Sequence, residues 1–380
     1  MRIALVILHA DPTRGGAERY TTDLAVGLAG RRHEVSLLAS SFPVVLVGAD
    51  PVVIPARGAT RARRYNAFLD NLDRHLDQTR YDIVHAMLPV RRCDVYHPHA
   101  GIAQEAVATG HLKHDAAPAR LLSKVAIRLN ARRQRFAAVE RELLESARPP
   151  VVLCLSEYVK QFVRKHYTLP DSKLATLFNA VDLHRFDPAA QPGAGARVRE
   201  QFSIGPDKVV ALMIAQDFAR KGLRQSIEAL AQVDDPRLVL LVFGKQDPSP
   251  YADLARRLGV KDRVIFGGTT SDPQAAYQSA DFFVLPTRHD PCSLVVLEAL
   301  AMGLPVISTR FNGACEIMTD GTHGFVLPDP SDVHALAGVM RQMLDADRRQ
   351  TLRQACLRLR PELSYERHLD QLLRIYSVVR

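Results

Sequence analysis

The chain has 380 residues and a formal net charge of +9, and this length exceeds what one hydrophobic core usually reaches, so we expect two domains. Its content of 47% hydrophobic and 24% charged residues is ordinary for a soluble globular enzyme. Five scattered cysteines without a C-x-x-C pair argue against a disulfide framework and a zinc site, and no apolar stretch approaches the roughly 18 residues that span a bilayer. These features predict a cytoplasmic protein.

Short apolar strands alternate with helices through the first 180 residues. We expect strands at 2–8, 33–40, 44–48, 81–87, 94–99, 151–156 and 174–181, and helices at 17–30, 60–79, 115–147 and 156–167. This alternation predicts a parallel sheet with helices on both faces.

The segment FDPAAQPGAGA, residues 186–196, has the composition of an interdomain linker. After it, strands are expected at 209–215, 238–244, 263–268, 281–287, 304–309 and 324–328, with helices at 223–233, 251–260, 273–280 and 293–303. A last helix, 364–380, carries leucines at helical spacing and is expected to pack against another element. The pattern predicts an α/β protein of two Rossmann-like domains, 1–186 and 187–363, facing each other across a cleft. Open parallel sheets bind ligands at the carboxyl ends of their strands, so the cleft is the expected site.

Two segments concentrate the positive charge. Residues 111–150 contain nine Lys or Arg against four acidic residues, and the segment RGATRARR, residues 57–64, adds four arginines. Such a surface suits nucleic acid, anionic lipid headgroups or phosphorylated glycans, although a solvated helix face has the same composition. Apolar residues within 121–129 also allow a basic amphipathic helix at a membrane surface.

Two loops that follow expected strands carry residues suited to phosphate. Gly15 and Gly16 precede a helix, where glycine lets the backbone approach a ligand and the helix N–H groups point at it; a tight turn is the plainer reading. In the second domain, Arg220 and Lys221 lie near a helix start, where the helix dipole disfavours cations. That placement favours a diphosphate ligand over a merely solvated pair.

The segment HDPCSLVVLEAL, residues 289–300, holds two carboxylates around an apolar run. Ser293 is the expected N-cap of a buried helix, whose N–H groups at Leu294, Val295 and Val296 would be free for an anion. Glu298, on the second turn, would then accept hydrogen bonds from two ligand hydroxyls, such as those of a ribose, and Asp290 would hold another hydroxyl-bearing group. A carboxylate pair also occurs in glycoside hydrolases.

Together these residues resemble the family 4 retaining glycosyltransferases of the GT-B fold. The resemblance covers nearly the whole chain and is carried by RGGAER (14–19), LSEYVKQFVRKHY (155–167), FNAVDLHRF (178–186), DFARKGLRQSIEAL (217–230) and DPCSLVVLEALAMGLPV (290–306). The last segment is a form of the family's E-x7-E motif. Within the family, the likeness is greatest to the lipopolysaccharide core α-1,3-glucosyltransferases.

The resemblance implies roles for these positions. Gly15, Gly16 and Arg19 belong to the donor-binding set, Arg220 and Lys221 hold the diphosphate, backbone at Leu294 and Val295 caps the phosphates, Glu298 binds the ribose, and Asp290 orients the sugar. The family places a histidine near the reacting sugar, so His97 and His99 of HPHAG are candidates, and their i, i+2 spacing on a strand would put both on one face. A two-histidine metal site and simple packing are the alternatives. The C-terminal helix is implied to cross back to the first domain.

The implied reaction moves a hexose, expected to be glucose from UDP-glucose, to a hydroxyl of a lipopolysaccharide-core or other envelope glycan, with no metal or other cofactor. We expect an anionic inner-membrane surface as a further partner, and no nucleic acid. Three positions depart from the family: Asp290 replaces the usual Glu, Ala215 replaces an Arg, and Asn179-Ala180 replaces Asn-Gly. The rival functions are a nucleotide-sugar epimerase, a phosphorylase and a non-catalytic basic binding protein.

Overall fold

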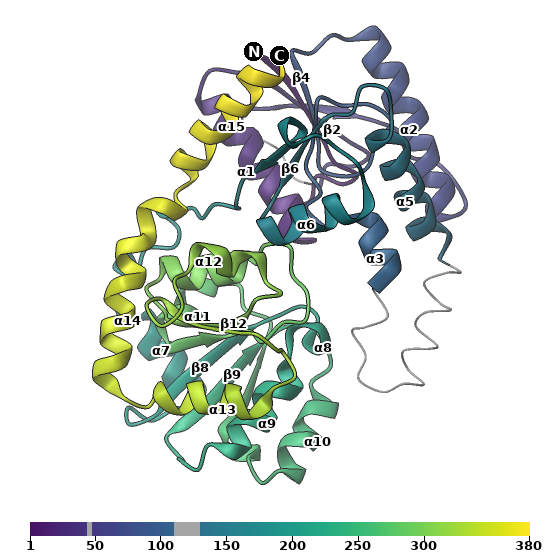
Figure 1. Cartoon of the computed structure of the whole chain (residues 1–380). Helices are drawn as coiled ribbons and strands as arrows, with labels where there is room; N and C mark the ends of the chain where they lie inside the picture. The colour runs from purple at the N-terminus through teal and green to yellow at the C-terminus, as the bar shows by residue number, and fades with distance from the viewer. Residues whose placement is uncertain (44–47, 110–129) are drawn as a thin grey trace. The chain divides into compact units, whose positions relative to one another are not determined.

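The computed structural model describes residues 1–43, 48–109 and 130–380 (Figure 1). The chain divides into two compact units. Unit 1 contains Met1–Phe178 and His368–Arg380, and unit 2 contains Asn179–Arg367. No helix of the described residues combines the length and the apolar character needed to cross a membrane.

Unit 1 is built on a seven-stranded parallel sheet of order β3-β2-β1-β4-β5-β6-β7. The strands are β1 (Arg2–Val6), β2 (Glu34–Ala39), β3 (Asp50–Val53), β4 (Ile83–Ala86), β5 (Val95–Tyr96), β6 (Val151–Cys154) and β7 (Leu174–Thr176). Its helices are α1 (Gly16–Gly30), α2 (Arg61–Gln78), α3 (Ala103–Thr109), α5 (Ala131–Leu144) and α6 (Glu157–His166), joined by most of α15 (Tyr365–Val379).

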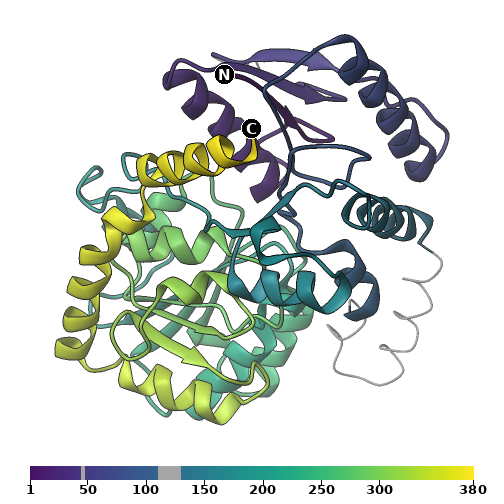
Figure 2. The same cartoon turned by 45° about the horizontal axis from the view of Figure 1, so that its top comes forward.

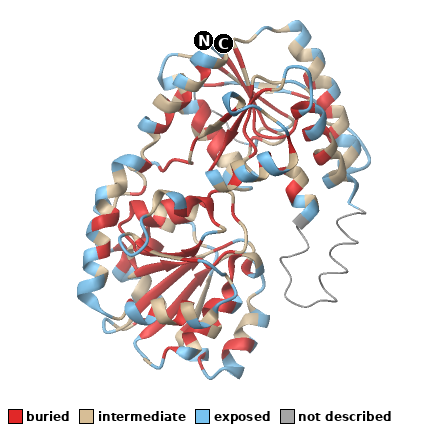
Figure 3. Cartoon of the chain, viewed as in Figure 1, coloured by how far each residue is buried: buried red, intermediate tan, exposed pale blue. Residues whose placement is uncertain are grey.

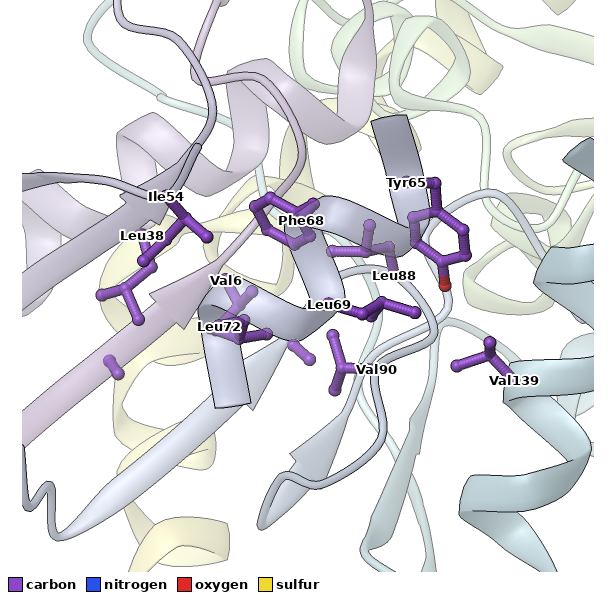
Figure 4. Close-up of a cluster of buried hydrophobic side chains, with 12 residues drawn as sticks. Val6, Leu38, Ile54, Tyr65, Phe68, Leu69, Leu72, Leu88, Val90 and Val139 are labelled. Atoms are coloured by element: carbon purple, nitrogen blue, oxygen red, sulfur yellow. The ribbon is translucent and has the colours of Figure 1, made fainter. Parts of the chain in front are cut away.

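One face of α2 forms much of the core of unit 1 (Figure 4). The cluster contains Tyr65, Phe68, Leu69 and Leu72 of α2, with Val6 and Leu38 of the sheet and Val139 of α5. Spacings of three and four residues place these α2 side chains on one side of the helix. Burying each of them stabilises the fold by about 1.5 to 3 kcal/mol, which explains why a helix rich in charge elsewhere holds its place.

Unit 2 repeats the design with a six-stranded parallel sheet of order β10-β9-β8-β11-β12-β13. The strands are β8 (Val209–Ile214), β9 (Leu238–Phe243), β10 (Val264–Gly268), β11 (Phe282–Val284), β12 (Val306–Thr309) and β13 (Gly324–Leu327). The helices are α7 (Ala194–Gln201), α8 (Phe218–Lys221), α9 (Leu223–Gln232), α10 (Ser249–Arg257), α11 (Pro273–Gln278), α12 (Leu294–Ala301), α13 (Val333–Gln342) and α14 (Ala346–Leu359). The central strands are buried (Figure 3), as expected for a parallel sheet covered on both faces.

The C-terminal helix α15 packs on unit 1, as predicted. Figures 1 and 2 both show it beside α1, where the Leu369 side chain lies against Gly27. Arg31, the C-cap residue of α1, forms a salt bridge of 2.7 Å with Asp370 of α15. The apolar spacing seen in the sequence therefore serves this contact.

The division between the units lies between Phe178 and Asn179, whereas the sequence placed it after Phe186. The reason is that 179–187 bonds to unit 2: Val181 pairs with Ser364, and the Phe186 carbonyl accepts from Arg360 at 2.9 Å. The expected linker instead runs into helix α7.

Several expected elements differ from those observed. Residues 44–47 of the expected strand 44–48 and residues 115–129 of the expected helix 115–147 lie outside the described part of the chain. Gly48 is described and is not in a strand, and the remainder of the expected helix contains α5. The expected strand 94–99 is shortened to Val95–Tyr96. Helix α14 was not predicted, because its buried face consists of only Leu352, Ala355 and Cys356.

Candidate functional site

The loop between β8 and α9 holds the two cations singled out in the sequence. Asp217 caps the short helix α8 by accepting from the Arg220 N–H at 3.1 Å, and Gly222 ends it in the left-handed region, at φ 82°. A Cβ at Gly222 would lie 2.4 Å from the Pro286 carbonyl oxygen. Only glycine allows this close approach, which brings Arg220 and Lys221 beside the loop that follows β11.

Lys221 and Asp290 form a buried ion pair, with the Lys221 ammonium hydrogen-bonded to the Asp290 carboxylate. Burial lowers the pKa of Lys221, while the Asp290 charge opposes this shift. Burial alone would raise the pKa of Asp290, but the charges of Lys221 and Arg220 outweigh it and hold the pKa below its usual value. The aspartate is therefore ionised at neutral pH. Two residues that the sequence singled out separately, 69 positions apart, therefore form one ion pair.

Backbone contacts hold Asp290 in this position. Its N–H donates to the Phe311 carbonyl at 2.9 Å, and its own carbonyl accepts from the Gly313 N–H at 3.0 Å. Arg220 lies 4.0 Å from the Asp290 carboxylate and donates to the His289 carbonyl at 2.7 Å. The ion pair and Arg220 thus lie on two loops, those after β8 and β11, that hydrogen bonds hold at the carboxyl edge of the unit 2 sheet.

Helix α12 begins where the sequence predicted, after Ser293. The Ser293 side chain makes no capping bond, and the Val296 N–H donates to the Ser293 carbonyl at 3.2 Å, so the expectation of a free Val296 N–H was wrong. Within the described residues, the N–H groups of Leu294 and Val295 have no acceptor. These two donors remain available to an anion at the helix N-terminus.

Glu298 is half-buried rather than enclosed in the core, because α12 turns this side chain toward Tyr277 of α11. The Tyr277 hydroxyl lies 2.8 Å from a Glu298 carboxylate oxygen and 3.1 Å from the Val295 carbonyl oxygen. Burial and the Glu298 charge raise the pKa of Tyr277 well above its usual value, so the hydroxyl keeps its proton and donates it to the carboxylate. The sequence carried no signal for Tyr277.

Two asparagines also support this site and were missed. The Asn312 side-chain oxygen accepts from the Ser293 and Ala314 N–H groups, both at 3.2 Å. The Asn179 amide donates to the Cys292 carbonyl at 3.0 Å, and among the described residues its buried oxygen has no partner. Both hold the loop that leads into α12. In the sequence, Asn179 was noted only because an alanine follows it.

The remaining sequence candidates belong to unit 1. Helix α1 begins at Gly16, with Gly15 as its N-cap in an extended conformation. The Arg19 N–H donates to the Gly15 carbonyl at 3.1 Å, and its half-exposed side chain lies 3.6 Å from the Asp23 carboxylate. Gly15 therefore ends the loop between β1 and α1, and Gly16 is already the first residue of the helix, one residue earlier than expected.

His97 and His99 follow strand β5 instead of lying on it, because β5 ends at Tyr96. Their rings are nevertheless close, with centroids 4.1 Å apart, and the Tyr20 ring lies 4.1 Å from that of His99. The Nε2 atoms of both histidines are buried and have no hydrogen-bond partner among the described residues. Burial lowers the pKa of each ring well below its usual value, so both are neutral at pH 7.

A further histidine network lies behind this pair and connects it to α15. His85 contacts the Tyr376 hydroxyl at 2.5 Å and His97 Nδ1 at 3.2 Å. His368 donates from Nδ1 to the Phe178 carbonyl at 2.8 Å, which leaves its Nε2 to accept from the Tyr20 hydroxyl at 2.7 Å. In the part of the chain that the structure describes, no group of three or more His, Cys, Asp or Glu side chains is arranged to hold a metal ion.

Comparisons with known proteins agree with this architecture. Residues 14–185 match the family model for Glycosyltransferase Family 4, and residues 196–356 match that for Glycosyl transferases group 1. The lipopolysaccharide glucosyltransferase WaaG of Escherichia coli K12 is 26% identical over 87% of this chain and 86% of its own length. The lipopolysaccharide core biosynthesis glycosyltransferase LpsE of Rhizobium meliloti is 33% identical over 38% of this chain and 42% of its own.

Solved structures share the fold. A WaaG crystal structure covers 94% of this chain and 95% of its own, with a TM-score of 0.78 and 24% identity. Anabaena HepE, crystallised with UDP-glucose, covers 99% of both chains with a TM-score of 0.72 and 18% identity. The predicted likeness to lipopolysaccharide core glucosyltransferases is thereby confirmed. The chain belongs to the glycosyltransferases of the GT-B fold, with a Glycosyltransferase Family 4 domain followed by a Glycosyl transferases group 1 domain.

Proposed function

We propose that the chain is a retaining hexosyltransferase that moves glucose from UDP-glucose to a hydroxyl of a lipopolysaccharide-core or related cell-envelope glycan. The observation that carries this proposal is the group formed by Lys221, Asp290 and Arg220 beside the α12 N-terminus. The names of the relatives in Escherichia coli and Rhizobium meliloti support the acceptor class.

In this proposal, the donor diphosphate binds Arg220, Lys221 and the N–H groups of Leu294 and Val295. Charge-assisted hydrogen bonds of this kind contribute about 1.5 to 3 kcal/mol each, and they stabilise the negative charge that grows on the leaving diphosphate. Glu298, held by Tyr277, accepts from the ribose hydroxyls. These contacts supply the stabilisation that a divalent cation provides in other enzymes, so the reaction is proposed to need none.

In this proposal, Asp290 orients the transferred sugar, and its hydrogen bond with Lys221 neutralises the ammonium charge. The departing phosphate takes the proton of the acceptor hydroxyl on the face where the new bond forms, which retains the anomeric configuration. Gly15, Gly16 and Arg19 are proposed to contact the donor. His99, whose buried Nε2 has no partner among the described residues, is proposed to lie near the reacting sugar together with His97. The proposed location is the cytoplasm, at the inner face of the membrane that carries the acceptor.

A binding experiment and a turnover experiment test this function. UDP is expected to raise the melting temperature more than GDP does, and UDP-glucose is expected to be consumed when a lipopolysaccharide-core acceptor is present. Glu298→Ala should remove nearly all transfer and leave the melting temperature of the free protein close to that of the wild type. No thermal shift with any nucleotide, or full turnover by Glu298→Ala, would contradict the proposal.

A further inference from the structure

A cavity of about 600 Å³ lies within unit 1, and all of its lining residues belong to that unit. Its walls include the starts of two long helices, residues 60–62 at α2 and residues 130–133 at α5. Thr60 caps α2 by accepting from the Arg63 N–H, and Asn130 caps α5 by accepting from the Arg133 N–H, both at 3.1 Å. Two positive helix ends therefore converge on one cavity.

Arginines from both basic segments of the sequence line this cavity. Arg61 comes from the 57–64 segment, and Arg132 and Arg133 come from the 111–150 segment. Within the described residues, none of the three forms a salt bridge. By contrast, Arg91, in the loop between β4 and β5 of the same unit, pairs with Asp70 and Asp73, both at 2.7 Å. The cavity arginines thus lie together without a salt-bridged carboxylate among the residues that the structure describes.

The environment of Arg132 shows that this arrangement is unfavourable in the free protein. Burial lowers the pKa of Arg132, and the charges of Arg61 and Arg14 lower it further, against a smaller opposing effect of Tyr65 and Glu18. The Arg132 guanidinium lies 5.1 Å from the centre of the Phe136 ring, which holds the side chain in place. A half-buried cation beside two like charges is repelled by them, and an anion bound next to it would reduce this repulsion.

The positive potential extends to the neighbouring His9. Burial lowers its pKa, and the charges of Arg14, Arg132 and Arg64 lower it further. The three arginine charges thus act on His9 in the same direction as its burial, as expected where positive charge is concentrated.

The rest of the lining is apolar and suits the carbon face of a sugar. Phe136 stacks on Tyr65 with centroids 4.2 Å apart, and Leu88 and Pro98 complete this floor. Pro98, Ala100 and Gly101 in the wall are the chain neighbours of His99, so the cavity adjoins the loop proposed to face the reacting sugar. A lining that combines apolar side chains with arginines fits a saccharide that carries a negatively charged substituent.

We propose that this cavity binds a phosphoryl group carried by the acceptor saccharide, through Arg61, Arg132 and the N-termini of α2 and α5. This inference rests on the proposed function for the identity of the acceptor, but the anion site itself can be tested without donor or turnover. Phosphate is favoured because the guanidinium fork pairs with two of its oxygens and backbone N–H groups take the others.

Site-resolved protection of arginines provides the test. The whole chain is treated with phenylglyoxal in glucose 6-phosphate, in inorganic phosphate, or in glucose with sodium chloride at equal ionic strength, and each arginine is followed by peptide mass spectrometry. Both phosphates should slow modification of Arg61 and Arg132, and glucose with chloride should not. Arg74, an exposed arginine about 20 Å along α2 from Arg61, should react equally in all three solutions. Equal rates at Arg61 and Arg132 in all solutions would overturn the inference, whether or not UDP binds.

Substitutions of the cavity arginines provide a second test of phosphate binding. Arg132→Gln and Arg61→Gln should weaken glucose 6-phosphate binding at least about tenfold, the equivalent of losing one charge-assisted hydrogen bond, while Arg74→Gln should not change it. Arg132→Gln should melt at or above the wild-type temperature, because its charge is repelled in the free protein; a clear drop would assign the arginine to the fold and overturn the proposal. UDP affinity should stay unchanged in all three variants. Protection by phosphatidylglycerol vesicles with none by the sugar phosphate would make the cavity a membrane contact instead and would also overturn it.

Discussion

The Tyr277 hydroxyl donates to the Glu298 carboxylate at 2.8 Å, and this contact links helices α11 and α12 of unit 2. It answers why a carboxylate is tolerated in an apolar helix: the side chain is half-buried and already has a hydrogen-bond donor. The same contact points one carboxylate oxygen at Tyr277 and fixes the direction of the other. The tyrosine thus acts as a positioning residue for the proposed ribose contact.

Tyr277→Phe is therefore expected to weaken UDP binding about tenfold or less, because the carboxylate keeps its charge but loses its fixed direction. Titration calorimetry with UDP measures this change. Tyr251→Phe is the matched control, since Tyr251 packs edge-on against Phe218 in the same unit without a hydrogen bond to Glu298. Equal affinities for Tyr277→Phe and the wild type would show that Tyr277 does not orient Glu298.

Asp290→Asn is expected to destabilise unit 2 by about 3 kcal/mol, because it leaves the Lys221 ammonium buried without its counter-charge. Urea unfolding at pH 7 measures the loss. Asp253→Asn removes a partner of the exposed Arg256, at 2.7 Å, and should cost about 1 kcal/mol or less.

A double variant separates the charge from the shape of the Lys221–Asp290 site. Lys221→Met combined with Asp290→Leu should be more stable than Asp290→Asn alone, since no unpaired charge remains. If the single and double variants unfold at the same urea concentration, the ion pair is not what holds the two loops together.

Gly222→Ala is expected to cost more than about 2 kcal/mol, because alanine at φ 82° is strained and its Cβ would meet the Pro286 carbonyl at 2.4 Å. Gly259→Ala isolates the first effect: Gly259 has φ 72° and nothing within 4 Å of an added Cβ, so only strain of about 1 kcal/mol remains. Denaturant unfolding compares the two. Gly222→Ala should also weaken UDP binding, because α8 carries Arg220 and Lys221; similar costs at both glycines would refute the close-approach argument.

Stability is expected to fall as the pH drops below 6.5, because of the buried histidines of unit 1. Burial lowers the pKa of His85 to about 3 and of His368 to about 4. Above pH 6.5 these histidines are neutral in both the folded and the unfolded chain, so they do not change the free energy of unfolding. Below it the unfolded chain takes up protons that the folded one refuses, so each such histidine removes about 1.4 kcal/mol per pH unit until its folded pKa is reached.

Melting temperatures between pH 7.5 and 4.5 test this pH dependence. His85→Asn should melt lower than the wild type at pH 7.5, since the contacts with Tyr376 and His97 change, but its melting temperature should fall less steeply with pH. His334→Asn replaces an exposed histidine and should follow the wild-type curve. A His85→Asn slope as steep as the wild type would assign the acid sensitivity to other groups.

The sequence by itself determined the two parallel sheets, the docking of the last helix and the positions of most candidate donor-binding residues. These features depend on local patterns: apolar strands of a few residues, helical spacing of leucines in 364–380, and glycines or caps where strands turn into helices. Arg220, Lys221, Gly15 and Gly16 lie in loops that follow strands, so the strand order of a parallel sheet is enough to bring each to the carboxyl edge of its own sheet.

Only the tertiary structure decided which side chains meet. Lys221 binds Asp290 across 69 residues, Tyr277 binds Glu298 across 21, and Tyr376 reaches His85 across 291. Helix and strand periodicity relates only residues that are close in sequence, so no local sequence pattern predicts contacts between side chains this far apart. The two basic segments show this most clearly, because the composition of each is equally compatible with a solvated helix face. Folding brings Arg61 and Arg132 to one cavity without a salt-bridged carboxylate among the described residues, and this shared position makes the cavity a candidate anion-binding site.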